Sequence, residues 1–490
     1  MSLMKLKSGT DIRGTAVGEN IELTDDAIMR IASAFVAFLS EKTGVKKEDI
    51  TLAVGHDSRI SAARIKNDLL CVFAAKGIRV FDCGLSSTPA MFMTTVTLGV
   101  TASVQITASH HPYDKNGLKF FTKDGGFEGE DIKAILERAE ALSSVETAAP
   151  CAEEIDFMAR YSEILKKKII EGINDGEKPL SGFHIVVDAG NGAGGFFPAL
   201  LQELGADTNG SQFLEPDGMF PNHIPNPEDK TAMGFISDAV IKNKADLGII
   251  FDTDVDRAAC VASDGGEINR NSLIALSSVI ALENSPGGTV VTDSVTSSGL
   301  REFINEHLGG KHYRYKRGYR NVINKAIQLN NMGIDCPLAI ETSGHAALRE
   351  NYFLDDGAYL MVKIIILMAR LKKEGKTFDS LLAPLKKPFA EKEIRYIIEE
   401  EDFRAYGERV IKDFEEYCEQ FPLITPADDN REGFRVNFHR LCGDGWLLVR
   451  LSVHDPVIPV NMESDADDGI EDIERFWNGF IKNYDKLRKK

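Results

Sequence analysis

Three segments of the chain repeat one pattern: a β-branched apolar run, a small or polar turn, and a helix-like segment ending near a glycine. They begin at Ile50, Phe183 and Gly288 and read ITLAVGHDSRISAARIKNDLLCVFAAKGIRVFDCG, FHIVVDAGNGAGGFFPALLQELGAD and GTVVTDSVTSSGLREFINEHLGG. Strand, turn and helix in this order predict βαβ units with parallel strands. Their wide spacing favours three related α/β domains in series, and one large α/β domain with insertions is the alternative.

The C-terminal part of the chain follows a different pattern. A charged helical segment, EEEDFRAYGERVIKDFEEYCEQF, precedes three stretches that predict strands, FRVNFHR, WLLVRLSV and VIPVNMES, and a final helix from Asp468. A chain of 490 residues is also too long for one ordinary core. We therefore predict α/β domains at residues 1–155, 156–270 and 271–387, and a smaller α+β domain at residues 388–490.

Charge and cysteine content argue against several classes of function. Lys plus Arg number 57 against 75 Asp plus Glu, and the net charge of −18 disfavours binding to a nucleic-acid backbone. The 7 cysteines are scattered without CxxC spacing, which favours a reduced cytoplasmic protein over a disulfide framework or a zinc site. The most apolar helical stretch, AYLMVKIIILMARL, contains Lys363 and is too short to span a bilayer. We expect a cytoplasmic protein without nucleic-acid or membrane partners.

Three carboxylates follow an apolar run in DLGIIFDTDVDRAACVASDGG, residues 246–266. Asp252, Asp254 and Asp256 would repel one another unless a cation neutralised them. Oxygen ligands favour Mg²⁺ over zinc, and strand ends in α/β folds are where ligands bind. A solvated acidic turn is the alternative.

A serine follows a predicted strand in TASHHPYDKNGLKFF, residues 107–121. A metal held by three carboxylates has room for one further anionic ligand, and phosphoryl transfer depends on such charge neutralisation. Ser109 is therefore a candidate phosphoryl carrier, with Lys119 as its charge partner. A helix N-cap serine followed by surface histidines is the alternative.

Two further stretches carry weaker signals. LAIETSGHAALRENYFLDDGAY, residues 338–359, presents a carboxylate, a hydroxyl and an imidazole that suit sugar hydroxyls. VRLSVHDPV, residues 449–457, presents donors that suit a phosphate that is not reacting. Taken alone, each stretch is explained better by its alternative, a polar loop for the first and an exposed strand edge for the second. The side chains concerned are Glu341, Ser343 and His345 in the first stretch, and Arg450, Ser452 and His454 in the second.

Taken together in chain order, these motifs resemble those of the α-D-phosphohexomutase family, most closely its phosphomannomutase/phosphoglucomutase branch. The matching stretches are SGTDIRGTA, TASHHPYDKNGLK, DTDVDR and IETSGH, with minor matches at VGHDSR, GNGAG, HIPNPE and the DDG of residues 355–357. YKRGYR, residues 315–320, resembles a substrate-contacting loop and points to Lys316 and Arg320. The sequence departs from the family pattern at His111, Val255 and Ile340, and at His454 with its neighbour Asp455.

The resemblance implies three α/β domains with mixed sheets and a smaller α+β domain around a central cleft. It also implies a phosphoserine at Ser109 facing Mg²⁺, which is held by Ser109 and the three aspartates. The enzyme would interconvert hexose 1- and 6-phosphates of mannose or glucose, with hexose 1,6-bisphosphate as intermediate and activator, as a monomer or homodimer. Arg13, Lys119 and Arg257 would stabilise the transferring charge. Lys119, His110 or His345 would move the hydroxyl proton.

Three other functions remain open at this point. FDTDVD is similar to the haloacid-dehalogenase motif, in which the first aspartate is the nucleophile, but Asp256 stands where that motif has Thr or Ser. Phosphoglucosamine mutases have a closely similar sugar loop. The departures from the family pattern also leave open a sugar-phosphate-binding protein with altered catalysis.

Overall fold

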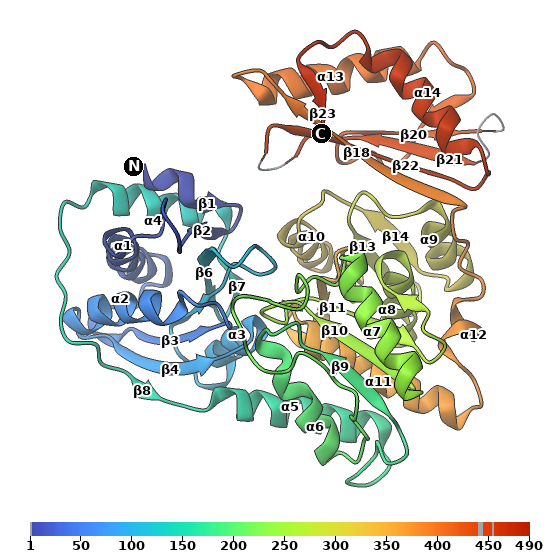
Figure 1. Cartoon of the computed structure of the whole chain (residues 1–490). Coiled ribbons are helices and arrows are strands. Elements are labelled where there is room, and N and C mark those ends of the chain that lie inside the picture. Colours follow the sequence, from blue (N-terminus) through green and yellow to red (C-terminus); the bar gives the residue numbers. More distant parts are fainter. Residues whose placement is uncertain (1, 440–443, 453–454) are drawn as a thin grey trace. The chain divides into compact units, whose positions relative to one another are not determined.

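The computed structural model describes residues 2–439, 444–452 and 455–490 (Figure 1). These residues form two compact units. The first unit comprises Met1–Leu273 and Ser343–Ser380, and the second comprises Ile274–Thr342 and Leu381–Lys490. The chain therefore leaves the first unit, returns to it for 38 residues and leaves it again.

The N-terminal part of the first unit is a mixed sheet in the order β1-β2-β6-β5-β3-β4-β8, with β7 paired to β6. The central strands β3, β4 and β5 are parallel, whereas β6 runs antiparallel to both β5 and β2. The strands are β1 (Lys7–Ser8), β2 (Asp11–Thr15), β3 (Thr51–His56), β4 (Arg79–Leu85), β5 (Ala102–Ile106), β6 (Lys115–Thr122), β7 (Gly125–Gly126) and β8 (Glu153–Glu154).

Four helices accompany this sheet: α1 (Asp25–Thr43), α2 (Ala62–Ala75), α3 (Thr88–Thr97) and α4 (Gly129–Ala141). Apolar residues of α1, α2 and α4 form one core cluster with those of the sheet. The sequence sets the ends of α1 locally: the Thr24 side chain accepts a hydrogen bond from Ala27 N, and Gly44 ends the helix in the left-handed conformation.

The second sheet of the first unit has the order β12-β11-β10-β9. β10 lies between β9, to which it is parallel, and β11, to which it is antiparallel. The loop after β10 therefore starts in the interior of the sheet and not at its edge. Its strands are β9 (Ile185–Asp188), β10 (Leu247–Phe251), β11 (Ala258–Ala262) and β12 (Glu267–Ile268), with helices α5 (Phe157–Ile173), α6 (Phe197–Glu203) and α7 (Lys230–Asn243).

The returning segment adds the hairpin of β16 (Ala346–Leu348) and β17 (Leu354–Asp355), then the apolar helix α11 (Gly357–Lys373). α11 packs against α5 and β11.

The second unit begins with a three-stranded parallel arrangement in which β13 pairs with β14 and β15. Its elements are α8 (Arg270–Glu283), which starts in the first unit, β13 (Thr289–Thr292), α9 (Ser298–Glu302), β14 (Lys311–Arg314), α10 (Tyr319–Asn331) and β15 (Leu338–Ile340). Strands alternate with helices here as the βαβ pattern predicts.

The C-terminal part of the second unit is an antiparallel sheet in the order β19-β20-β21-β22-β18-β23. Its helices α13 and α14 share one apolar core with the sheet and lie on the same side of it (Figure 1). The elements are α12 (Phe378–Leu382), β18 (Ala390–Ile398), α13 (Phe403–Cys418), β19 (Ile424–Pro426), β20 (Phe434–Phe438), β21 (Gly445–Val449), β22 (Val457–Ser464), α14 (Gly469–Ile481) and β23 (Leu487–Lys489).

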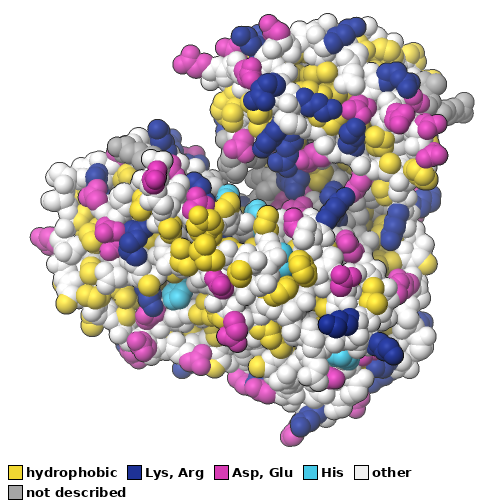
Figure 2. Space-filling view, in the orientation of Figure 1, with side chains coloured by type: hydrophobic (Ala, Val, Ile, Leu, Met, Phe, Trp, Pro, Cys, Tyr) yellow, Lys and Arg dark blue, Asp and Glu magenta, His cyan; other side chains and the backbone are white. Residues whose placement is uncertain are grey.

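Acidic and basic side chains are interspersed on the face drawn in Figure 2, without one extended basic surface. No helix among the described residues has the length and apolar character needed to cross a membrane.

Candidate active site

The loop after β5 holds Ser109 in an uncommon backbone conformation. Its φ of 51° lies in the left-handed region, which few residues other than glycine adopt. The Ser109 amide donates a hydrogen bond of 2.9 Å to Oγ1 of Thr107, and the residue is 4% exposed. Ser109 Oγ donates to Oδ2 of Asp252 at 3.0 Å and accepts from Nη2 of Arg257 at 3.2 Å. The two motifs identified in the sequence therefore meet at this hydroxyl.

The three aspartates lie in the tight turn between β10 and β11. Asp252, Asp254 and Asp256 are each at most 1% exposed, and they offer oxygen atoms that lie within 4.8 Å of one another. Oδ1 of Asp254 and Oδ1 of Asp256 are buried and accept no hydrogen bond from any residue that the structure describes. A buried carboxylate oxygen that accepts no hydrogen bond raises the free energy of the folded state unless a cation contacts it. These oxygen atoms therefore fit a hard divalent ion.

Two basic side chains partly neutralise these carboxylates. Nζ of Lys119, on β6, lies 2.9 Å from Oδ2 of Asp254 and 2.5 Å from Oδ2 of Asp256. Nε of Arg257 donates to Oδ2 of Asp252 at 3.0 Å. Burial and repulsion by Asp256 raise the pKa of Asp252. Burial opposes ionisation of Asp256 too, but attraction to Lys119 and His345 holds its pKa below the usual value.

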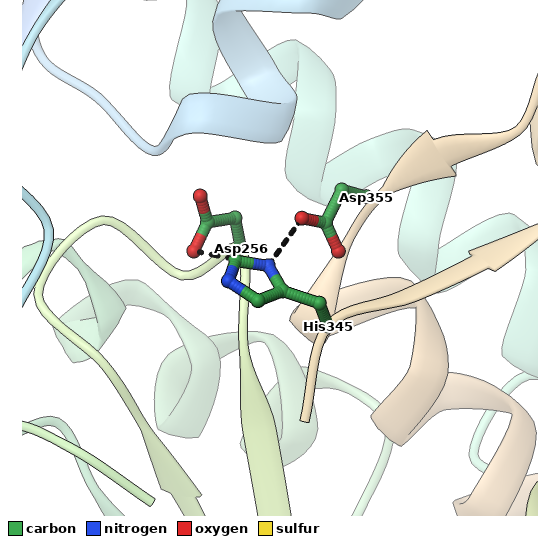
Figure 3. Close-up of side chains that lie close together, drawn as sticks. All are labelled: Asp256, His345 and Asp355. Carbon is green, nitrogen blue, oxygen red and sulfur yellow. Dashed lines mark hydrogen bonds and ion pairs between the residues drawn. The ribbon is translucent and has the colours of Figure 1, made fainter. Parts of the chain in front are cut away.

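His345 lies between two carboxylates just before β16 (Figure 3). Its Nδ1 donates a hydrogen bond to Oδ2 of Asp355, on β17, and lies 3.9 Å from Oδ1 of Asp256. Burial opposes its charge, yet attraction to Asp355 and Asp256 raises the pKa of His345 to about 9. His345 thus places a cationic ring beside the metal loop.

The other side chains predicted for catalysis lie around the serine loop. Nδ1 of His110 is 3.3 Å from Ser109 Oγ, and burial together with the charge of Arg257 lowers the pKa of His110. Arg13 pairs with Asp11 at 2.6 Å, and its Nη1 donates to the carbonyl oxygen of Ala108 at 3.5 Å. The first unit therefore brings together every residue predicted for catalysis or metal binding.

The second unit holds most of the residues predicted to bind substrate. Glu341, just after β15, accepts a hydrogen bond of 2.6 Å from the amide of Gly318, so it contacts the loop that carries Lys316. Arg320 lies in the first turn of α10. Ser343 is the first residue of the segment that returns to the first unit, the segment that also carries His345. Its exposed fraction is 8%.

The predicted phosphate loop follows β21 in the second unit. Arg450 is 6% exposed, and its Nε has no hydrogen-bond partner among the described residues. A cavity of about 360 Å³ is lined by Arg450 and Ser452, together with Arg395 and Lys490. His454 lies outside the described residues.

Comparison with known proteins identifies the family. The chain matches the descriptions "Phosphoglucomutase/phosphomannomutase, alpha/beta/alpha domain I" over residues 4–146, "domain II" over residues 159–265 and "domain III" over residues 269–389. It is 30% identical to a phosphoglucomutase/phosphomannomutase of Thermococcus kodakarensis over 472 residues, which cover 95% of each protein. The chain belongs to the α-D-phosphohexomutase family. This confirms the family and the fold class predicted from the sequence.

Other relatives and solved structures agree with this assignment. A phosphomannomutase/phosphoglucomutase of Pseudomonas aeruginosa PAO1 is 28% identical over 437 residues, covering 89% of this chain and 88% of the relative. A crystal structure of a phosphoglucomutase/phosphomannomutase family protein from Burkholderia thailandensis has a TM-score of 0.80 at 25% identity, covering 99% of this chain and 98% of that one. The protein is a phosphohexomutase, an enzyme of the isomerase class.

The structure gives physical meaning to two of the phosphohexomutase's departures from the family pattern. Val255 has a φ of 64°, a conformation that glycine adopts without strain and a β-branched residue rarely adopts. The family pattern that DTDVDR resembles has glycine at this position, and the left-handed φ supplies a steric reason for it. Ile340 is fully buried as the last residue of β15 and pairs with Thr292, so it belongs to the core of the second unit. Nothing in the structure explains the histidine at position 111.

Sequence reasoning missed one residue that contacts the metal loop. Thr88, in the first turn of α3, donates from Oγ1 to Oδ2 of Asp254 at 2.5 Å and from its amide to the Asp254 carbonyl at 2.8 Å. The Ser-Ser-Thr-Pro stretch signals a helix start, since serine caps helices and proline favours the first turn. That signal does not reveal which loop the helix end contacts.

Two minor motifs also support the site. Asn226, in HIPNPE, accepts a hydrogen bond of 3.0 Å from Nη1 of Arg257. Asp355, in DDG, holds His345. The sequence analysis predicted no role for either residue, because both act through another side chain.

Proposed function

We propose that this phosphohexomutase interconverts the 1- and 6-phosphates of glucose and mannose through a phosphoserine at Ser109. The main support for this proposal is the position of the Ser109 hydroxyl. It is hydrogen-bonded to Arg257 and to Asp252, one of the three buried carboxylates of the metal loop. The names of the relatives, phosphomannomutase/phosphoglucomutase and phosphoglucomutase, support glucose and mannose as the sugars.

Asp252, Asp254 and Asp256 would hold Mg²⁺, with an oxygen of the phosphoryl group on Ser109 as a further ligand. The buried, donor-free oxygens of Asp254 and Asp256 support this assignment. A bound Mg²⁺ would supply charge neutralisation for the phosphoryl group.

The residues of the chain account for the rest of the reaction. A sugar hydroxyl oxygen bonds to the phosphorus as the bond between phosphorus and Ser109 Oγ breaks, which yields hexose 1,6-bisphosphate. Of the three candidate groups, the neutral ring of His110 can accept the hydroxyl proton, and the cationic Lys119 or His345 can supply the proton that Ser109 Oγ regains. Arg13, Lys119 and Arg257 stabilise the transferring charge. The bisphosphate then turns, and its other phosphoryl group returns to Ser109.

The substrate must be held in both orientations during this cycle. Donors on the phosphate loop would bind the phosphate that is not reacting, and the sugar loop would bind the hydroxyls. The buried Nε of Arg450, which has no partner among the described residues, supports a phosphate ligand there. The proposed substrate residues are Lys316, Arg320, Glu341, Ser343, His345, Arg450, Ser452 and His454.

Isotope labelling tests the proposal. Incubation with glucose 1,6-bisphosphate carrying ³²P should label Ser109, and the label should survive hydroxylamine, which cleaves an aspartyl phosphate. Ser109→Ala should abolish both the label and the conversion of glucose 1-phosphate to glucose 6-phosphate. Ser143→Ala, an exposed serine of the same unit, serves as the control. A label lost to hydroxylamine, or retained in Ser109→Ala, would refute the phosphoserine.

The preferred sugar is tested by comparing rates on mannose, glucose and glucosamine 1-phosphates. Fastest turnover of the glucosamine substrate would overturn our assignment.

We also propose a cytoplasmic location, because the six cysteines within the described residues are free thiols, as in a reducing compartment. The enzyme would act as a monomer or homodimer.

A further inference from the structure

The guanidinium of Arg59, in the VGHDSR stretch, is buried against the serine loop and is 2% exposed. Its Nη1 donates to the carbonyl oxygens of Pro112 at 2.7 Å and Lys115 at 2.8 Å. Its Nη2 donates to the carbonyl oxygens of Ser109 and His111, both at 2.5 Å. One side chain thus fixes four carbonyl groups within the seven residues that begin with the proposed phosphoryl carrier.

Asp57 holds both Arg59 and the start of the same loop. Its Oδ1 accepts a hydrogen bond of 3.0 Å from the amide of Arg59, and its Oδ2 lies 3.3 Å from Arg59 Nε. The same Oδ2 accepts a 2.7 Å hydrogen bond from Oγ1 of Thr107, which in turn accepts from the Ser109 amide. Asp57 and Arg59 therefore fix Ser109 from both of its peptide groups, Asp57 through Thr107 and Arg59 through the carbonyl.

The loop requires such support for two physical reasons. The left-handed φ of Ser109 persists only where surrounding contacts over-determine it. The buried carbonyl of Ser109, in the loop after β5, also needs a hydrogen-bond donor. The planar guanidinium meets both requirements because its donors have fixed directions, whereas a lysine ammonium has three donors on a flexible stem.

We propose that Arg59, held by Asp57, is a positioning residue for phosphoryl transfer to and from Ser109. This inference rests on the proposed role of Ser109 as phosphoryl carrier. The hydrogen bonds donated by Nη1 and Nη2 of Arg59 all go to backbone carbonyls of the serine loop, so Arg59 acts on the orientation of the serine. Transfer requires the attacking oxygen, the phosphorus and the leaving oxygen to lie in line. Releasing the loop should therefore slow transfer while leaving sugar-phosphate binding intact.

Single-turnover transfer from ³²P-labelled enzyme to glucose 1-phosphate, measured by rapid quench, tests this prediction. Arg59→Lys should slow the transfer step by about 100-fold, as small misplacements of reacting groups do. Its Kd for glucose 1-phosphate should stay within about threefold of wild type, because the interactions lost belong to the transition state. Arg59→Met should be slower than Arg59→Lys, since it retains no donor.

Arg64→Lys is the matched control. Arg64 is in α2, and it donates to the carbonyl oxygens of Ala16 and Leu23 and pairs with Asp25, outside the serine loop. We expect its transfer rate to equal that of wild type. Transfer at the wild-type rate by folded Arg59→Lys would overturn the proposal, as would a loss confined to substrate affinity.

A second variant covers the case in which Arg59→Lys does not fold. Asp57→Asn keeps the shape of the side chain but removes the charge that faces Arg59, and it should slow transfer in the same way. Wild-type transfer by folded Asp57→Asn would also overturn the proposal. A wild-type enzyme without label on Ser109 would refute the proposed function itself, whereas a labelled wild type with unaffected Arg59 and Asp57 variants would refute only the positioning role.

Discussion

Ser109 Oγ donates a 3.0 Å hydrogen bond to Oδ2 of Asp252, although the two residues are 143 positions apart in the chain. The contact joins the loop after β5 to the loop after β10 within one compact unit. A phosphoryl group on Ser109 would bring further negative charge to a cluster of carboxylates, which repel one another. A cation bound between the phosphoryl group and the carboxylates should therefore stabilise the phosphorylated enzyme more than the unphosphorylated enzyme.

Mg²⁺ should raise the thermal unfolding temperature of the wild-type enzyme, because a ligand that binds only the folded state stabilises it. At 100 times its Kd the ion should add about 2.7 kcal/mol to the free energy of unfolding. Asp254→Asn should lose most of this shift in differential scanning calorimetry. Asp238→Asn, an exposed aspartate on α7, should keep it. Equal shifts in the two variants would contradict a metal site at the aspartates.

Lys119→Met should destabilise the metal-free enzyme by about 3–5 kcal/mol, because it leaves buried carboxylates without their cation. The stabilisation by Mg²⁺ should be larger in this variant than in wild type, since Nζ of Lys119 contacts Asp254 and Asp256, which would bind the ion. Calorimetry with and without Mg²⁺ measures both effects. Lys123→Met, an exposed lysine just beyond β6, should change neither. A Mg²⁺ shift no larger than that of wild type would show that Lys119 does not oppose the ion.

The sequence predicted the parts of the site that lie within one short stretch. Ser109 and the three aspartates each follow an apolar run, and strand ends of this kind place ligand-binding groups at the edge of a sheet. Local patterns also predicted the alternation of strands and helices. The family pattern marked Val255 as unusual, and its positive φ supplies the reason.

Other parts of the site depend on contacts between distant segments, which a local pattern does not encode. Thr88 and Asp254 are 166 positions apart, and Arg59 lies 50 positions before Ser109. The sequence predicted that the apolar stretch of α11 is helical and too short to cross a bilayer, but not its packing against α5 and β11 in the first unit. Tertiary structure alone determines these pairings.

His223→Gln should destabilise the enzyme more at about pH 5.5 than at about pH 9. Its Nε2 lies 3.0 Å from Oδ1 of Asp188, and its Nδ1 lies 2.9 Å from the carbonyl oxygen of Ile224, so both ring nitrogens face acceptors. Burial opposes the charge, but the hydrogen bond and attraction from Asp188, with a smaller contribution from Asp229, raise the pKa of His223.

A raised histidine pKa fixes the sign of this pH dependence. The stabilisation is complete below the ordinary histidine pKa of about 6.5 and is lost as the pH rises through the raised value of the folded state. Urea unfolding at the two pH values measures the difference. His184→Gln is the control, because the His184 ring contacts only the carbonyl oxygen of Asn209 among the hydrogen bonds described for it. A larger loss at high pH would show that His223 is neutral in the folded enzyme.

Val255→Ala should be less stable than Val255→Gly, the reverse of the order at an ordinary buried position. Alanine keeps the Cβ atom that makes a left-handed φ unfavourable by about 1–2 kcal/mol, whereas glycine removes it. Neither variant should be more stable than wild type, because the fully buried valine side chain contributes about 1.5–3 kcal/mol that offsets the strain.

Val261, equally buried in β11, is the matched control. There the glycine variant should be the weaker one by about 0.5–1 kcal/mol. Thermal unfolding of the four variants decides the matter: the same order at both positions would mean that Val255 is not strained, and the usual glycine would then need another explanation.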